Sequence, residues 1–174
     1  MQTLLNDIEL DIQELKCLMQ AISTDTNPVL RIVAKRNIHQ MQEKLEGVDF
    51  DVVLGPESRG FIFGVPIAYN MHKAFVPVRK KGKLPRATIS QTYDLEYGTA
   101  TIEIHKDAIQ PGQKVVIIDD LIATGGTTEA IIKMVEELGG EVVKIVFLME
   151  LAGLKGRERL SGYDIDSAII YEGK

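Results

Sequence analysis

The pattern of apolar and polar positions along the chain predicts alternating strands and helices. Short, mainly apolar runs, which are typical of strands buried on both faces of a sheet, occur at residues 50–54, 74–78, 115–118 and 142–148. Between the last two runs, apolar residues recur on one helical face up to Leu138, and Gly139 and Gly140 end that helix. Strand, loop, helix and strand in this order predict an α/β fold with a central parallel sheet flanked by helices. Ligands of such sheets bind at the carboxyl ends of the strands.

The first 47 residues carry a helical pattern in two parts. Apolar residues recur at steps of three and four and predict a first helical stripe formed by Leu5, Ile8, Ile12, Leu15, Met19 and Ile22. Polar residues and Pro28 break this pattern, and a second helix is expected from about 29 to 45. We expect the first stripe to pack either on the main domain or on a second subunit.

Residues 79–90 are predicted to form a long mobile loop that contains Gly82 and Pro85. Five of the nine residues at 79–87 are basic: Arg79, Lys80, Lys81, Lys83 and Arg86. In a chain of net charge −5 this clustering indicates an anionic partner, although a solvated basic loop is the alternative. Residues 99–104 alternate between polar and apolar types and predict an exposed or edge strand.

The composition is that of one globular domain, 1–174, with an ordinary core: 45% of the 174 residues are hydrophobic and 26% are charged. The net charge of −5 argues against binding to nucleic acid, which requires a basic surface, but leaves room for a local anion pocket. Cys17 is the single cysteine, so an intrachain disulfide is excluded. The first eleven residues carry three acids and no base, and no apolar run reaches the length of a membrane span. We therefore expect a cytoplasmic protein that does not enter a membrane.

The most informative segment is 115–128, with the sequence VVIIDDLIATGGTT. A buried strand ends in two acids, Asp119 and Asp120, and a glycine-containing loop then leads directly into a helix. A helix N-terminus offers free N–H groups and a partial positive charge, and glycines let the backbone wrap closely around a phosphate. The segment lacks the Gly-Lys-Ser/Thr of a Walker loop and the spaced glycines of a dinucleotide site. Two acids just before a phosphate loop suit the diol of a ribose that carries a 5′-phosphate.

This segment resembles the motif that binds phosphoribosyl pyrophosphate (PRPP) in the type I phosphoribosyltransferases. The resemblance implies that Asp119 and Asp120 contact the ribose hydroxyls during catalysis, directly or through the water shell of a metal ion. It implies that the 5′-phosphate is held by Ala123, Thr124, Gly125, Gly126 and Thr127. Mg²⁺ is the implied cofactor, and no direct protein ligand for it is predicted.

Two further segments resemble the adenine phosphoribosyltransferases within that family. Residues 55–61, GPESRGF, resemble their pyrophosphate loop, in which Ser58 and the planar donor fork of Arg59 face phosphate oxygens. A cis peptide bond between Glu57 and Ser58 is implied as well. Residues 93–98, YDLEYG, followed by IEIHKD at 102–107, resemble the segment near the base. The resemblance implies that Glu96, protonated and with a raised pKa, donates to N7 of the purine as N9 attacks C1′.

The same resemblance makes residues 79–98 a flexible lid that closes over pyrophosphate. The implied lid contacts are Arg79, Lys80, Lys83 and Tyr97. Closure would exclude water and strengthen electrostatic interactions in the site. The three histidines have no Cys or acid at metal-ligand spacing, and we interpret them as structural or solvated: His39, His72 and His105.

The N-terminal region departs from the family pattern. These enzymes have Phe-Arg-Asp shortly before Pro-Leu-Leu or Pro-Val-Leu, in a small hood that grips the base. This chain has Pro28-Val29-Leu30, but residues 23–27, STDTN, contain no aromatic residue and no arginine. The hood within residues 1–47 is therefore expected to be altered, with looser selection of the base.

The leading hypothesis is an enzyme of purine salvage that converts adenine and PRPP to AMP and pyrophosphate. Two alternatives remain open: transfer to another purine, such as hypoxanthine, xanthine or guanine, or a PRPP-sensing regulator that has lost catalysis. Retention of the basic lid and of Glu96 argues against the regulator. Members of the family are commonly dimeric, so a homodimer is expected.

Overall fold

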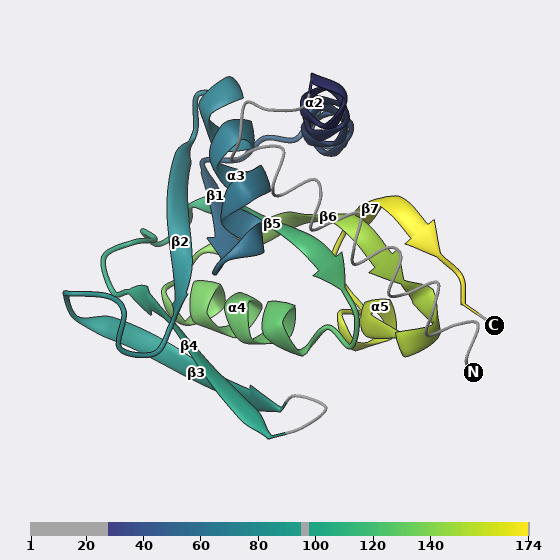
Figure 1. The fold of residues 1–174 in the computed structure, drawn as a ribbon. Coiled ribbons are helices and arrows are strands. Elements are labelled where there is room, and N and C mark those ends of the chain that lie inside the picture. The colour runs from purple at the N-terminus through teal and green to yellow at the C-terminus, as the bar shows by residue number, and fades with distance from the viewer. Residues whose placement is uncertain (1–27, 95–97, 174) are drawn as a thin grey trace.

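Seven strands form one sheet in the order β3-β4-β2-β1-β5-β6-β7. The computed structural model describes residues 28–94 and 98–173. The strands are β1 (Val52–Pro56), β2 (Ala74–Lys80), β3 (Thr88–Asp94), β4 (Thr99–His105), β5 (Lys114–Ile122), β6 (Glu141–Leu151) and β7 (Ile165–Tyr171). The five strands β2-β1-β5-β6-β7 are parallel to one another. Strand β4 pairs antiparallel with both β2 and β3. The predicted parallel α/β sheet is confirmed and carries an antiparallel hairpin at one edge (Figure 1).

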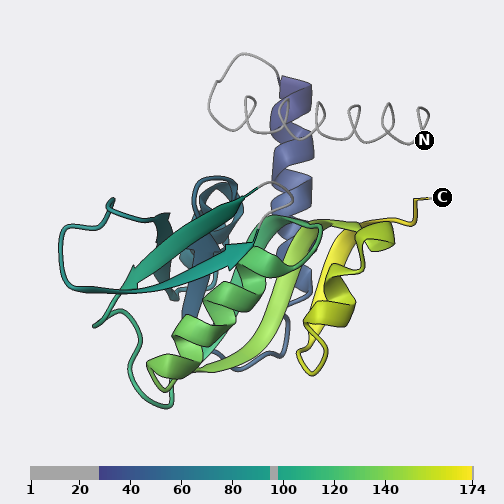
Figure 2. The same ribbon diagram turned by 90° about the horizontal axis from the view of Figure 1, so that it is seen from below.

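Helices cover both faces of the sheet. The helices are α2 (Pro28–Glu43), α3 (Arg59–Asn70), α4 (Gly126–Glu137) and α5 (Gly156–Arg159), and η1 (Ala152–Leu154) is a short 3-10 turn. Helices α2 and α3 lie on one side of β5 and α4 on the other (Figure 1, Figure 2). Within the part of the chain that the structure describes, no helix has the length and apolar character needed to cross a membrane.

The two layers of core follow from the alternation of side chains along β5. Val115 and Ile117 point to the cluster beneath α4, which includes Ile131. Val116 and Ile118 point to the opposite cluster beneath α3, which includes Phe63. Because both faces of β5 are covered by apolar side chains, its sequence reads as a continuous apolar run rather than an alternating one.

The expected elements are found with small shifts at their ends. The helix expected from about 29 to 45 is α2, and the four apolar runs are strands β1, β2, β5 and β6. The N-terminal stripe that starts at Leu5 lies outside the described residues.

Two expectations about residues 79–104 are wrong. The expected loop over 79–90 is much shorter, because β2 continues through Lys80 and β3 already begins at Thr88. Strand β4 is not an edge strand, because β3 pairs with it along its whole length, from Thr88 opposite His105 to Asp94 opposite Thr99. The pairing supplies the hydrogen bonds that order these polar residues, which their own sequence pattern does not indicate.

Candidate active site

A pocket of about 600 Å³ opens at the carboxyl ends of β1 and β5. This is the edge of a parallel sheet at which ligands are expected to bind. It is lined by Pro56, Glu57, Ser58, Arg59, Lys80, Tyr93 and residues 119–128. The predicted ribose acids, 5′-phosphate loop and pyrophosphate loop are thus brought to one cavity.

The two acids at the end of β5 are both buried at the base of this pocket. Asp119 is 9% exposed and Asp120 is 3% exposed, and the backbone N–H of Asp120 donates to Oδ1 of Asp119 at 2.8 Å. Burial, and next the charge of Asp120, raise the pKa of the Asp119 carboxyl well above its ordinary range. The half-exposed guanidinium of Arg59 pairs with the Asp120 carboxylate. The pair therefore offers oxygens that can accept hydrogen bonds from a diol while Arg59 limits their mutual repulsion.

The loop between β5 and α4 wraps the N-terminus of a three-turn helix. Gly125 has φ +77°, a conformation that favours glycine, and α4 begins at Gly126. Because backbone N–H groups at a helix N-terminus are free of intrahelical partners, they suit a phosphate at this end of the pocket. The positions predicted to hold the 5′-phosphate, from Ala123 to Thr127, all line it.

The first turn of α5 packs against the loop between β5 and α4. A Cβ atom added to Gly156 would lie 2.3 Å from the carbonyl oxygen of Ala123, and one added to Gly125 would lie 2.8 Å from the carbonyl oxygen of Gly156. Arg157 fixes this turn, because its Nε donates to Oε1 of the buried Glu150 at 3.0 Å. This contact could not be predicted, since nothing local in the sequence of residues 150–157 indicates an approach to residues 123–125.

The predicted pyrophosphate loop joins β1 to α3. The peptide bond between Glu57 and Ser58 is cis, as the resemblance implied. Ser58 is the N-cap residue of α3 and Arg59 its first residue, so both face the pocket from a helix N-terminus. Gly60 is required for close packing, because a Cβ there would lie 3.0 Å from the carbonyl oxygen of Ile118. The loop therefore lies directly against the strand that carries the acid pair.

Glu57 connects this loop to the basic segment and was not among the predicted site residues. Its carboxylate accepts a hydrogen bond from Nε of Arg79 at 2.9 Å, pairs with the Lys83 ammonium, and accepts from the backbone N–H of Lys80 at 3.1 Å. Hydrogen bonds from Lys83 and then Arg79 lower the pKa of Glu57 to about 2. The parallel pairing of β1 with β2, which sets Pro56 beside Val78, creates this contact. Sequence spacing alone could not reveal it.

The remaining predicted residues fall into two groups. Lys80 lines the pocket, whereas Arg79 and Lys83 reach its border through Glu57. Glu96 and Tyr97 lie outside the described residues, as do residues 23–27 of the expected hood.

The fold and this pocket define a phosphoribosyl transferase domain. The profile of the family described as "Phosphoribosyl transferase domain" matches residues 25–173. Over 140 residues the chain is 76% identical to an adenine phosphoribosyltransferase of Lachnoclostridium phytofermentans and 66% identical to one of Agathobacter rectalis, each match covering 80% of both proteins. The chain belongs to the adenine phosphoribosyltransferase family and is a phosphoribosyltransferase enzyme.

Solved structures agree with this assignment. An adenine phosphoribosyltransferase from Thermoanaerobacter pseudethanolicus is 55% identical with a TM-score of 0.77, over 79% of this chain and 80% of that one. The Giardia lamblia enzyme, solved with 9-deazaadenine, is 34% identical with a TM-score of 0.77, over 88% of this chain and 84% of that one. The type I phosphoribosyltransferase fold expected from the sequence is therefore confirmed.

Proposed function

We propose that this protein transfers the 5-phosphoribosyl group of PRPP to adenine, giving AMP and pyrophosphate in purine salvage. The observation that carries the proposal is the convergence of two loops and the acid pair of β5 on one pocket of about 600 Å³. PRPP has a 5′-phosphate, a diol and a pyrophosphate, and each meets groups of suitable chemistry there. The family membership supports adenine as the accepting base.

Each part of the pocket has a separate task in the proposed reaction. Residues 123–127 bind the 5′-phosphate at the N-terminus of α4, and Asp119 and Asp120 accept hydrogen bonds from the ribose hydroxyls. The C1′–O bond breaks with its electron pair leaving on pyrophosphate, a C1′–N9 bond forms to the base, and the base releases its imidazole N–H proton to pyrophosphate or solvent. Because negative charge develops on the leaving oxygen, donors held in place beside it stabilise the transition state.

The donors for pyrophosphate come from two elements. Ser58 and Arg59 approach from the N-terminus of α3, and Lys80 from the end of β2. Arg79 and Lys83 are already held beside the pocket by Glu57. Closure of the lid would bring these cations onto the leaving group and exclude water. Glu96 and Tyr97 remain the proposed contacts from the lid to the base and to pyrophosphate.

Mg²⁺ is the proposed cofactor. When bound, it neutralises the charge of the departing pyrophosphate. Among residues 35–94 and 98–173, no three Asp, Glu, His or Cys side chains are grouped to hold a metal ion by themselves. The acid pair fits the oxygen chemistry of Mg²⁺, which commonly keeps several waters and takes substrate oxygens as ligands. Asp119 and Asp120 would therefore orient the water shell of the metal.

A homodimer in the cytoplasm is proposed as the working form. Two large side chains one turn apart on α3 are exposed, Val65 at 47% and Tyr69 at 79%, and burying them in a second subunit would be favourable. Analytical ultracentrifugation of the wild-type protein and of the Tyr69→Glu variant tests the assembly. A monomer in the wild-type sample would contradict it.

The proposed function is tested by incubating the protein with PRPP, Mg²⁺ and each purine in turn, followed by nucleotide chromatography. AMP from adenine, with pyrophosphate in equal amount, is the expected product. Omission of Mg²⁺ should abolish turnover. Binding of PRPP without formation of any nucleotide would instead support the regulator.

A further inference from the structure

We propose that Glu103 is a positioning residue for the pyrophosphate half of the site, and this inference rests on the proposed transfer from PRPP. Its carboxylate folds the turn at residues 82–84 and thereby aims Lys83. Glu103 does not line the pocket and does not touch the expected position of the substrate. It acts through the backbone of another segment.

The backbone contacts of Glu103 converge on a single oxygen, Oε1, while the Thr88 hydroxyl donates to Oε2 at 3.5 Å. The residue lies on β4, opposite Arg79 of β2, and is only 5% exposed. Its Oε1 accepts hydrogen bonds from the backbone N–H groups of three consecutive residues: Gly82 at 3.0 Å, Lys83 at 3.1 Å and Leu84 at 3.2 Å. Three successive N–H groups aimed at one point form an anion-binding concavity, and here a side chain of the protein fills it.

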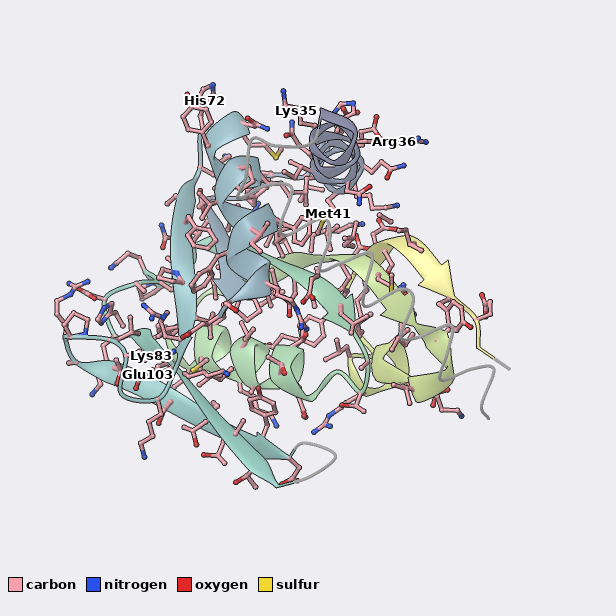
Figure 3. The ribbon with its side chains drawn as sticks, in the orientation of Figure 1. Lys35, Arg36, Met41, His72, Lys83 and Glu103 are labelled. Carbon is pink, nitrogen blue, oxygen red and sulfur yellow. The ribbon has the colours of Figure 1, made fainter. Side chains whose placement is uncertain are left out.

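The turn adopts this shape only around an acceptor. Gly82 has φ +82°, a conformation that favours glycine, and it brings its own N–H and the next two toward the carboxylate. Without Glu103, three partly buried N–H groups would lose their acceptor, which is unfavourable, so the turn would open toward water. Figure 3 shows Lys83 and Glu103 side by side where the basic segment crosses β4.

Glu103 affects the pyrophosphate half of the site through Lys83. Its backbone N–H is held by Glu103, while its ammonium pairs with Glu57 in the pyrophosphate loop. Glu57 also binds Arg79, which β2 supplies independently of the turn. Arg79 is therefore positioned by a strand, whereas Lys83 is positioned by a turn whose shape depends on the buried carboxylate of Glu103. Loss of Glu103 should misplace Lys83 and leave Arg79 in place.

The test compares the binding of pyrophosphate with Mg²⁺ and the binding of AMP by calorimetry. Glu103→Ala is expected to weaken pyrophosphate binding about tenfold, which corresponds to about 1.4 kcal/mol, and to change AMP binding less than twofold. Glu103→Gln, which keeps an acceptor oxygen, should restore most of the affinity. In a Lys83→Ala background, Glu103→Ala should have little further effect, because both substitutions remove the same contribution, that of the Lys83 ammonium to pyrophosphate binding.

A second variant and a control separate this role from general stability. Gly82→Ala strains the turn through φ alone, since its added methyl would meet no atom within 4 Å, and it should reproduce the effect of Glu103→Ala. Thr101→Val removes a hydroxyl contact of 2.9 Å with Thr92 on the same hairpin and should change neither affinity. Equal weakening of AMP and pyrophosphate, full additivity with Lys83→Ala, or unchanged binding in Glu103→Ala would each overturn the proposal. Failure of the wild-type protein to make AMP would refute the proposed function instead. The chromatography of nucleotide products measures this separately.

Discussion

Arg59 and Asp120 form an ion pair that links the N-terminus of α3 to the carboxyl end of β5. The Asp120 side chain is 5% exposed and the Arg59 side chain 50%, so the acid is fixed and the guanidinium is open to a ligand. The pair holds Arg59 beside the expected position of the leaving group before substrate arrives. Such preorganisation favours electrostatic stabilisation, because little rearrangement is then needed during the reaction.

Arg59→Ala is expected to lower kcat about a hundredfold, since a donor aimed at developing charge typically contributes about 3 kcal/mol. Steady-state kinetics with adenine and PRPP measures the effect. Lys114→Ala is the control, because Lys114 begins β5 at the end opposite the acid pair and its ammonium pairs with the exposed Asp49. Loss of activity in both variants alike would show that only net positive charge matters.

Asp119→Asn is expected to weaken PRPP use and to stabilise the fold at pH 7.5. The pKa of Asp119 is raised by burial and by Asp120, so between pH 3.8 and its folded-state pKa this group binds more proton in the folded state than in the unfolded state. The unfolded state therefore binds fewer protons, and this group makes stability fall as pH rises above its ordinary value of 3.8. Thermal unfolding should show a higher Tm for the variant than for the wild type at pH 7.5, with a difference that shrinks toward pH 4. A lower Tm at pH 7.5 would contradict the raised pKa.

Glu57→Gln is expected to destabilise the protein at neutral pH. The pKa of Glu57 lies near 2, below its ordinary value of 4.5, so its ionised form contributes stability above pH 4.5 and loses that contribution as pH falls toward 2. Unfolding curves of the two proteins should therefore differ at pH 7 and converge as the pH falls from 4.5. A difference in stability that stays constant across this pH range would show that the effect does not come from the charge of Glu57.

Gly156→Ala is expected to weaken AMP binding roughly tenfold or more, because small displacements of a positioning loop have large effects. The new methyl group would lie 2.3 Å from the carbonyl oxygen of Ala123 and must displace the phosphate loop. Gly153→Ala is the control, since the nearest heavy atom to its Cβ would be 3.9 Å away. Calorimetry with AMP and with pyrophosphate should show that the first ligand is affected more. Equal affinities in the two variants would show that the turn does not support the loop.

The sequence predicted those parts of the site that are continuous along the chain. The strand, acid pair, glycine turn and helix from Val115 to Thr128 follow one another directly, so local pattern and chemistry were sufficient. The contacts of Glu57 with Lys83, and of Gly156 with Ala123, join segments that only the sheet brings together. Strand β3 was missed because cross-strand pairing, rather than its own polar sequence, determines its structure.

Base selection tests the central claim most directly. In one assay with PRPP and Mg²⁺, kcat/KM is compared for adenine, hypoxanthine, guanine and xanthine. Adenine should be preferred over each 6-oxopurine by at least about tenfold, or 1.4 kcal/mol in transition-state binding. Residues 23–27 lack the aromatic residue and arginine of the family hood, so KM for adenine should be higher than in relatives that have them. Preference for a 6-oxopurine by tenfold or more would contradict the account.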